Sequence, residues 1–231
     1  MKRILVGVSA ATLLIAAPAY AQSIEDQVAA QLAASGIDPA TASQTQIDAA
    51  LNSVLVAAVE AQLGGSAATA SSADLAAAVG AILANNPNLS TGTVAALTTA
   101  AIGQNQSAAG AVAGAAAAQR PADAAQIARA AATAAPGEVT SIVEETSTAV
   151  VNAGGTAADV GAVVANAAAA PGVDTSTADL SVAAAGATGL NADDINAGAS
   201  DEVVEAVETV ENVEDIEDDD ENSAQDDASP S

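Results

Sequence analysis

The sequence contains no cysteine, histidine, tryptophan or phenylalanine. Its single tyrosine, Tyr20, and its single lysine, Lys2, both lie among the first 21 residues. Without cysteine the chain has no disulfide framework, and without histidine and cysteine the usual zinc and copper ligands are missing. A nucleophile activated by histidine or lysine is also excluded from the rest of the chain. We therefore expect a protein that is not an enzyme and holds no cofactor.

Residues 1–21 have the pattern of an export signal. Lys2 and Arg3 form a basic start, an apolar stretch follows from Ile4 to Ala17, and Ala19-Tyr20-Ala21 has the small residues of a cleavage site. This apolar stretch is shorter than the ~20 residues that a membrane-spanning helix requires. We expect an exported mature chain that begins at Gln22, contains no membrane span and resides in a periplasm or outside the cell.

The charge of the chain is strongly negative and unevenly distributed. The net charge is -25, and loss of residues 1–21 would remove two of the four basic residues and leave Arg120 and Arg129. Of the 29 acidic residues, 14 lie between Asp201 and Asp227. Because nucleic acids and anionic lipids are bound through lysine and arginine, we expect neither as a partner. Cations and basic proteins are the partners that this charge favours.

Alanine dominates a chain that has few large side chains. Isoleucine, leucine and valine make up about 19% of residues 22–231, a proportion at which strongly charged chains approach disorder. Alanine, however, is the best helix former and loses no side-chain entropy when a helix forms. Each buried methyl group contributes only about 0.8 kcal/mol, so stability requires many close contacts. We predict an all-α fold of closely packed alanine-rich helices.

Residues 22–65 are predicted to form an N-terminal helical hairpin. Ser23 and Asp26 have the spacing of a capping box, and Gly36 ends the first helical stretch. A second stretch keeps helical spacing of its aliphatic residues until Gly64.

Residues 66–199 repeat the alternation of helix and turn with shorter side chains. Pro87 and Pro121 are 34 residues apart, and Pro136 and Pro171 are 35 apart. The stretch Ala135-Pro136-Gly137 with Thr140-Ser141 recurs as Ala170-Pro171-Gly172 with Thr175-Ser176. The spacing predicts a solenoid-like array of two-helix units. The aromatic residues of tetratricopeptide repeats, which have a similar length, are absent.

Within this region, Val112 is the only large aliphatic residue between Gly103 and Gln126. Gly110 and Gly114 form a GxxxG spacing, which permits close approach of two helices. The surrounding apolar run is too short to cross a bilayer, so close packing in water is the better interpretation. We take Gly110, Val112 and Gly114 as the candidate self-association surface. A flexible joint is the alternative interpretation of this stretch.

Residues 200–231 form an acidic tail that we expect to be largely disordered. Between Val204 and Glu217 an aliphatic-glutamate pair recurs every three residues, which does not match the 3.6 residues of a helical turn. Neighbouring glutamates at this spacing repel one another. Carboxylates favour calcium, but the EF-hand pattern is missing, so only weak multivalent cation binding is expected. Its candidate ligands are Asp218, Asp219, Asp220 and Glu221.

These features favour an exported, non-catalytic structural or interaction protein that associates with itself through close-packed alanine-rich helices, at the cell surface or in the extracellular space. The alternative hypothesis is an acidic cation-binding or hydrating polymer that acts through its C-terminal tail. A β-rich fibre is a third hypothesis, and it is disfavoured because alanine and glycine are poor strand formers.

Overall fold

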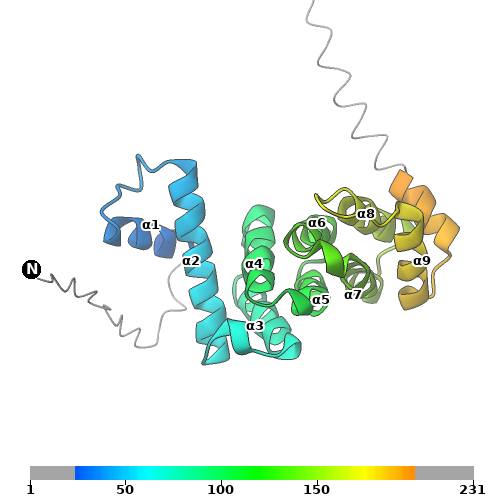
Figure 1. The fold of residues 1–231 in the computed structure, drawn as a ribbon, viewed down its shortest axis with the longest axis horizontal. Helices are drawn as coiled ribbons and strands as arrows, with labels where there is room; N and C mark the ends of the chain where they lie inside the picture. The colour runs from blue at the N-terminus through cyan, green and yellow to red at the C-terminus, as the bar shows by residue number, and fades with distance from the viewer. Residues whose placement is uncertain (1–23, 201–231) are drawn as a thin grey trace, which may run out of the picture.

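The computed structural model describes residues 24–200, and this part of the chain consists of helices and connecting turns without a β-strand (Figure 1). The prediction of an all-α fold is therefore confirmed. The predicted signal peptide and the acidic tail from residue 201 onward lie outside the described residues. The predicted domain boundaries stay predictions.

The described part of the chain begins with two helices that pack against each other, α1 (Ile24–Ala34) and α2 (Gln44–Leu63). Ser43 caps α2, because its backbone N–H donates to Oε1 of Gln46 at 2.9 Å and its hydroxyl accepts from the Gln46 N–H. The helix ends at Gly64, whose φ of 67° places it in the left-handed region that glycine adopts without strain. Local cap and stop residues thus define this pair of helices.

Seven further α-helices follow between residues 72 and 188, most of them joined by short turns. The connecting segments include the short 3₁₀-helices η2 (Ala67–Thr69) and η4 (Pro121–Asp123). A last helical segment spans residues 192–200. The seven α-helices are α3 (Ser72–Asn85), α4 (Thr91–Gln104), α5 (Ala109–Gln119), α6 (Ala124–Ala134), α7 (Val139–Asn152), α8 (Ala157–Ala168) and α9 (Thr177–Thr188).

The helices form two stacked rows. Each of α3, α5 and α7 packs extensively against the helix two positions later, and α2, α4 and α6 do the same in the second row. Figure 1 shows α3, α5 and α7 along one side of the molecule and α4, α6 and α8 along the other. Each unit of the stack is therefore a pair of consecutive helices, which confirms the predicted array of two-helix units.

The proline anchors of the predicted repeat occupy equivalent places. Pro87 lies between α3 and α4, and Pro121 lies between α5 and α6. Pro136 and Pro171 precede α7 and α9. The Thr-Ser anchors are not equivalent, and this part of the prediction was wrong. Ser141 lies inside α7, whereas Ser176 is the N-cap of α9. A dipeptide of small polar residues suits both a helix surface and a helix cap, so its recurrence does not fix a register.

Side chains in the connecting segments add hydrogen bonds between units and within one unit. The Asn105 amide donates to the carbonyl oxygen of Ala70 at 3.3 Å, and the Gln106 amide donates to that of Ala134 at 3.3 Å. The first bond joins the segments that precede α3 and α5, and the second joins the segment before α5 to the last residue of α6. The first bond therefore adds a directional contact between two units, and the second adds one within the α5–α6 unit.

Candidate interaction surfaces

The predicted self-association residues lie inside the molecule, where α5 packs against α7. Val112 is fully buried. A Cβ atom on Gly110 would lie 2.9 Å from the Ser141 carbonyl oxygen, and one on Gly114 would lie 2.9 Å from the Cβ of Glu145. The GxxxG spacing therefore permits close packing within one chain, and the stretch is a helix rather than a joint. Self-association of two copies through Gly110, Val112 and Gly114 stays a prediction. It would require α5 and α7 to separate.

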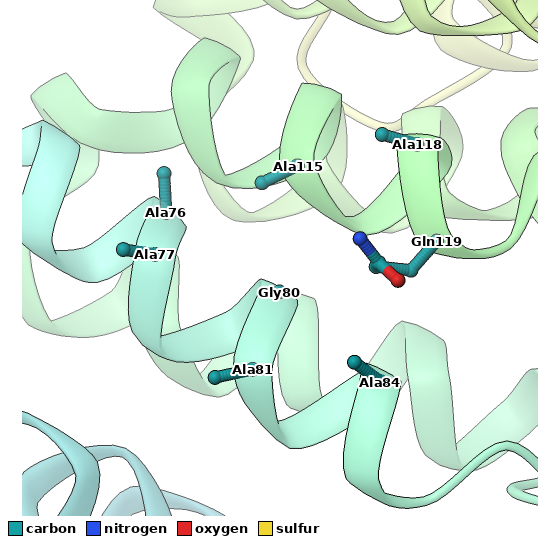
Figure 2. A pocket seen from close by; sticks show the side chains of 8 residues that line it. All are labelled: Ala76, Ala77, Gly80, Ala81, Ala84, Ala115, Ala118 and Gln119. Carbon is teal, nitrogen blue, oxygen red and sulfur yellow. The ribbon is translucent and has the colours of Figure 1, made fainter.

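A hollow of about 510 Å³ lies between α3 and α5. Figure 2 shows its lining side chains, which are alanines apart from Gly80 and Gln119, on the two facing helices, with the Gln119 amide between them. A second hollow of about 330 Å³ between α5 and α7 shares Ala118 with the first. A third, of about 590 Å³, reaches η2 and the end of α2 and shares Ala77 and Ala81. We call these three neighbouring hollows, which share lining residues, the small-residue groove.

Polar side chains occur along this groove at separate places. Asp74 lines the hollow near α2, Gln119 lines the central one, and Glu145 lines the one beside α7. No lysine or arginine lines it. The walls of the groove therefore combine methyl groups with uncharged polar side chains. Its charged positions are acidic, and they do not form a cluster of titratable groups that would act on a small substrate.

A separate apolar hollow of about 310 Å³ lies where α1, α2 and α4 meet. Its lining includes the aliphatic side chains of Ile24, Val28, Leu32, Ile47 and Leu51. These residues belong to the helical periodicity seen in the sequence, and Ile24, Val28 and Leu32 are buried in the core of the N-terminal pair. Packing between α1 and α2 accounts for most of this lining.

An ion pair within the α5–α6 turn is hydrogen-bonded to the segment between α3 and α4 and to the start of α4. The Arg120 guanidinium lies 2.7 Å from Oδ2 of Asp123 and donates to the carbonyl oxygens of Leu89 at 2.9 Å and Pro87 at 3.2 Å. The Thr91 hydroxyl donates to Oδ1 of Asp123 at 2.6 Å. These contacts engage both carboxylate oxygens, so the cluster fastens two neighbouring units and leaves little capacity for a ligand.

Acidic side chains are spread over the part of the chain that the structure describes. No group of three or more carboxylates there could hold a metal ion. The predicted cation ligands Asp218, Asp219, Asp220 and Glu221 lie outside the described residues. Asp159 accepts bonds from the Thr156 backbone N–H at 2.7 Å and from its hydroxyl at 2.8 Å, which lower the pKa of the Asp159 carboxyl. Thr156 and Asp159 have the three-residue spacing of a capping box, and they form the N-terminal cap of α8.

The chain matches no protein-family model, no curated protein and no solved structure at a significant level. Among residues 24–200, no helix is both long and apolar enough to span a membrane. The small-residue groove was not predicted from the sequence. In the sequence, Ala76, Ala115 and Ala118, which line it, cannot be distinguished from the many alanines that the fold buries.

Proposed function

We propose that this protein is an exported, non-catalytic structural or interaction protein that acts through contacts between its alanine-rich helices and another protein molecule, with a second copy as its first partner. The observation that carries the proposal is that glycine and alanine make the closest helix contacts inside the chain while similar small-residue surface stays uncovered. The small-residue groove along α3, α5 and α7 is such a surface among the described residues.

The chemistry of the uncovered surfaces favours a protein partner over a small molecule. Small-molecule sites combine a concave apolar wall with a few convergent polar groups. Here the two carboxylates along the groove, Asp74 and Glu145, lie in separate hollows, and the central hollow is lined mainly by alanines, each of which projects only one methyl group. Such walls let another helix approach closely, as α7 approaches α5 at Gly110 and Gly114.

The sequence supports the remaining parts of the proposal. The basic, apolar and small-residue segments of residues 1–21 favour export. Without histidine, cysteine or a lysine beyond Lys2, serine and threonine lack the usual base that would activate them as nucleophiles.

Light scattering coupled to size-exclusion chromatography tests the self-association directly. The mature chain, residues 22–231, is measured over a wide concentration range at moderate salt. We expect an average mass that rises with concentration toward at least a dimer. A mass that stays at one chain at the highest concentration would remove self-association from the proposed function.

The concentration of acidic residues in 201–227 supports a second candidate function, in which the tail holds cations. Isothermal titration of calcium into residues 22–231 and into residues 22–200 separates the two. A tail-based function predicts weak, multiple binding that is largely lost in the shorter chain. Equal uptake by both chains would contradict it.

A further inference from the structure

The sequence contains one Asp-Pro bond, and it lies in the segment between α1 and α2, where Asp38 precedes Pro39. Both residues are exposed, so water and protons reach the bond. This bond differs from an ordinary peptide bond in two ways. Its carbonyl carbon belongs to a residue whose own carboxylate can reach it. Its nitrogen belongs to a tertiary amide, which has no N–H and takes up a proton more readily when the bond breaks.

The turn around this bond holds the groups that would react. The backbone N–H of Ala40 donates to Oδ1 of Asp38 at 3.0 Å, which keeps the carboxylate on the side of the bond that follows Asp38. The carbonyl oxygen of Asp38 accepts from the backbone N–H of Thr41 at 3.0 Å and from the Thr41 hydroxyl at 3.4 Å. Two donors on one carbonyl oxygen stabilise the negative charge that develops there during attack on its carbon. Nucleophile and electrophile are thus oriented within one residue.

We propose that the chain cleaves its own Asp38–Pro39 bond in acid, through the Asp38 carboxylate, and thereby releases α1. A carboxylate oxygen of Asp38 bonds to the Asp38 carbonyl carbon, the carbon–nitrogen bond breaks, and the Pro39 nitrogen leaves with a proton from the solvent. The product on Asp38 is a five-membered cyclic anhydride, which one water molecule opens to two carboxyl groups. Each chain reacts once, so this step is self-processing and not turnover of a substrate. It is independent of the self-association proposed above.

Breaking this bond leaves α1 held only by packing, mainly against α2. Three buried aliphatic side chains of α1 line the apolar hollow together with Ile47 and Leu51 of α2. The 11 residues of α1 are too few to form a stable helix alone. A separate fragment also regains the translational freedom that the covalent link had removed, and this favours dissociation. Release of α1 would uncover Ile47 and Leu51.

The dependence on pH comes from the leaving nitrogen, since one proton is taken up for each bond broken. The titratable residues of the two flanking helices are all acidic, and α4, which also borders the hollow, has none. They are Glu25, Asp26, Asp48 and Glu60. Among the described residues, no ion pair involves Asp38. We expect the cleavage rate to rise at least tenfold between pH 6 and pH 4.

Mass spectrometry of the intact mature chain, residues 22–231, tests the cleavage. The chain is incubated at the lowest pH, near 4, at which circular dichroism shows that it stays helical, and we expect the fragments 22–38 and 39–231. Asp38→Asn keeps a hydrogen-bond acceptor but removes the carboxylate, so cleavage should slow at least tenfold. The Asn86–Pro87 bond of the same chain is an internal control and should stay intact. An uncleaved parent chain, or an Asp38→Asn variant cleaved at the parent rate, would overturn the proposal.

Two comparisons test whether the turn contributes to the rate. Thr41→Val keeps the backbone N–H and removes the hydroxyl donor, so cleavage should slow about threefold, and the helical signal should not change because Thr41 is exposed. A peptide of residues 34–46 contains the same bond without the flanking helices, and it should be cleaved at least five times more slowly than the folded chain. Equal rates in the peptide and the chain would indicate ordinary acid lability and would overturn the contribution of the fold.

Size-exclusion chromatography of the partly cleaved chain tests the release of α1. At micromolar concentration we expect fragment 22–38 to elute apart from fragment 39–231. The Asp38→Asn variant, treated in the same way, should give a single peak. Elution of the two fragments together in equal amounts would overturn the release, whereas the cleavage itself would stand.

Discussion

Gly161 of α8 lies directly against Gly198 of the segment 192–200. A Cβ atom on Gly161 would lie 2.6 Å from the carbonyl carbon of Gly198 and 2.6 Å from the backbone nitrogen of Ala199. On the facing helix, a Cβ atom on Gly198 would lie 2.8 Å from the Cα of Ala158. The segment 192–200 therefore packs on α8 through direct contact between backbone atoms. Only glycine permits this contact at both positions.

This contact predicts that Gly161→Ala destabilises the protein even though alanine is the better helix former. The added methyl group must push two helices apart, which costs about 1–3 kcal/mol in the free energy of unfolding. The matched control is Gly80→Ala in α3, where a Cβ atom meets nothing within 4 Å. That change should stabilise the protein by about 0.5–1 kcal/mol. Urea unfolding followed by circular dichroism measures both, and effects of the same sign would contradict the close contact.

Removing the buried hydroxyl of Thr146 should increase stability. Its Oγ1 is fully buried in α7 and has no hydrogen-bond partner, so Thr146→Val removes a desolvated polar atom at nearly constant volume. We expect a gain of about 1 kcal/mol in the free energy of unfolding. Thr98 in α4 is equally buried, but its hydroxyl donates to the Val94 carbonyl oxygen at 2.9 Å. Thr98→Val should instead be neutral or lose about 1 kcal/mol. In thermal melts the midpoint should rise for Thr146→Val and should stay the same or fall for Thr98→Val.

Arg120→Lys should weaken the connection between neighbouring units despite keeping the charge. One guanidinium reaches the carboxylate of Asp123 and two carbonyl oxygens at once, and a single ammonium group cannot reproduce this fork. We expect a loss of about 1–3 kcal/mol in the free energy of unfolding. Arg129→Lys on the exposed face of α6 should change it by less than about 0.5 kcal/mol. Comparable losses for both arginines would mean that the cluster does not fasten the units.

The cap at Asp159 predicts a specific dependence of stability on pH. Its hydrogen bonds from Thr156 favour the ionised form, so the pKa of Asp159 is lower in the folded chain than in the unfolded chain. The stabilisation is then fully present above the ordinary carboxyl pKa of about 3.9 and is lost as pH falls through the lowered value. The difference in unfolding free energy between the parent and Asp159→Asn should therefore shrink in acid. A difference that is constant from pH 7 to pH 2.5 would contradict this role.

Local signals in the sequence account for the class of the fold and for many helix ends. The spacing of Thr156 and Asp159 predicts the cap of α8, and Gly64 predicts the end of α2. Such signals work at short range because a cap or a left-handed glycine acts on backbone groups within one helical turn. The equivalent places of Pro87 and Pro121 likewise follow from the helix-breaking chemistry of proline.

The positions of the close helix–helix contacts do not follow from these local signals. Gly80 and Gly114 are both helical glycines in alanine-rich surroundings, yet one borders an open hollow and the other lies against α7. Alanine faces differ too little in size and polarity for the sequence to rank them. The GxxxG spacing could therefore indicate close packing but not whether the second helix belongs to the same chain.

The sequence by itself determined an all-helical chain of short units, because alanine propensity, caps and breakers act locally. Only the tertiary structure decided that Gly110 and Gly114 are covered by α7 while Val182 stays exposed on α9. Whether a residue is covered depends on which helices pack against each other. That packing is determined by the summed contacts of many small side chains in different units.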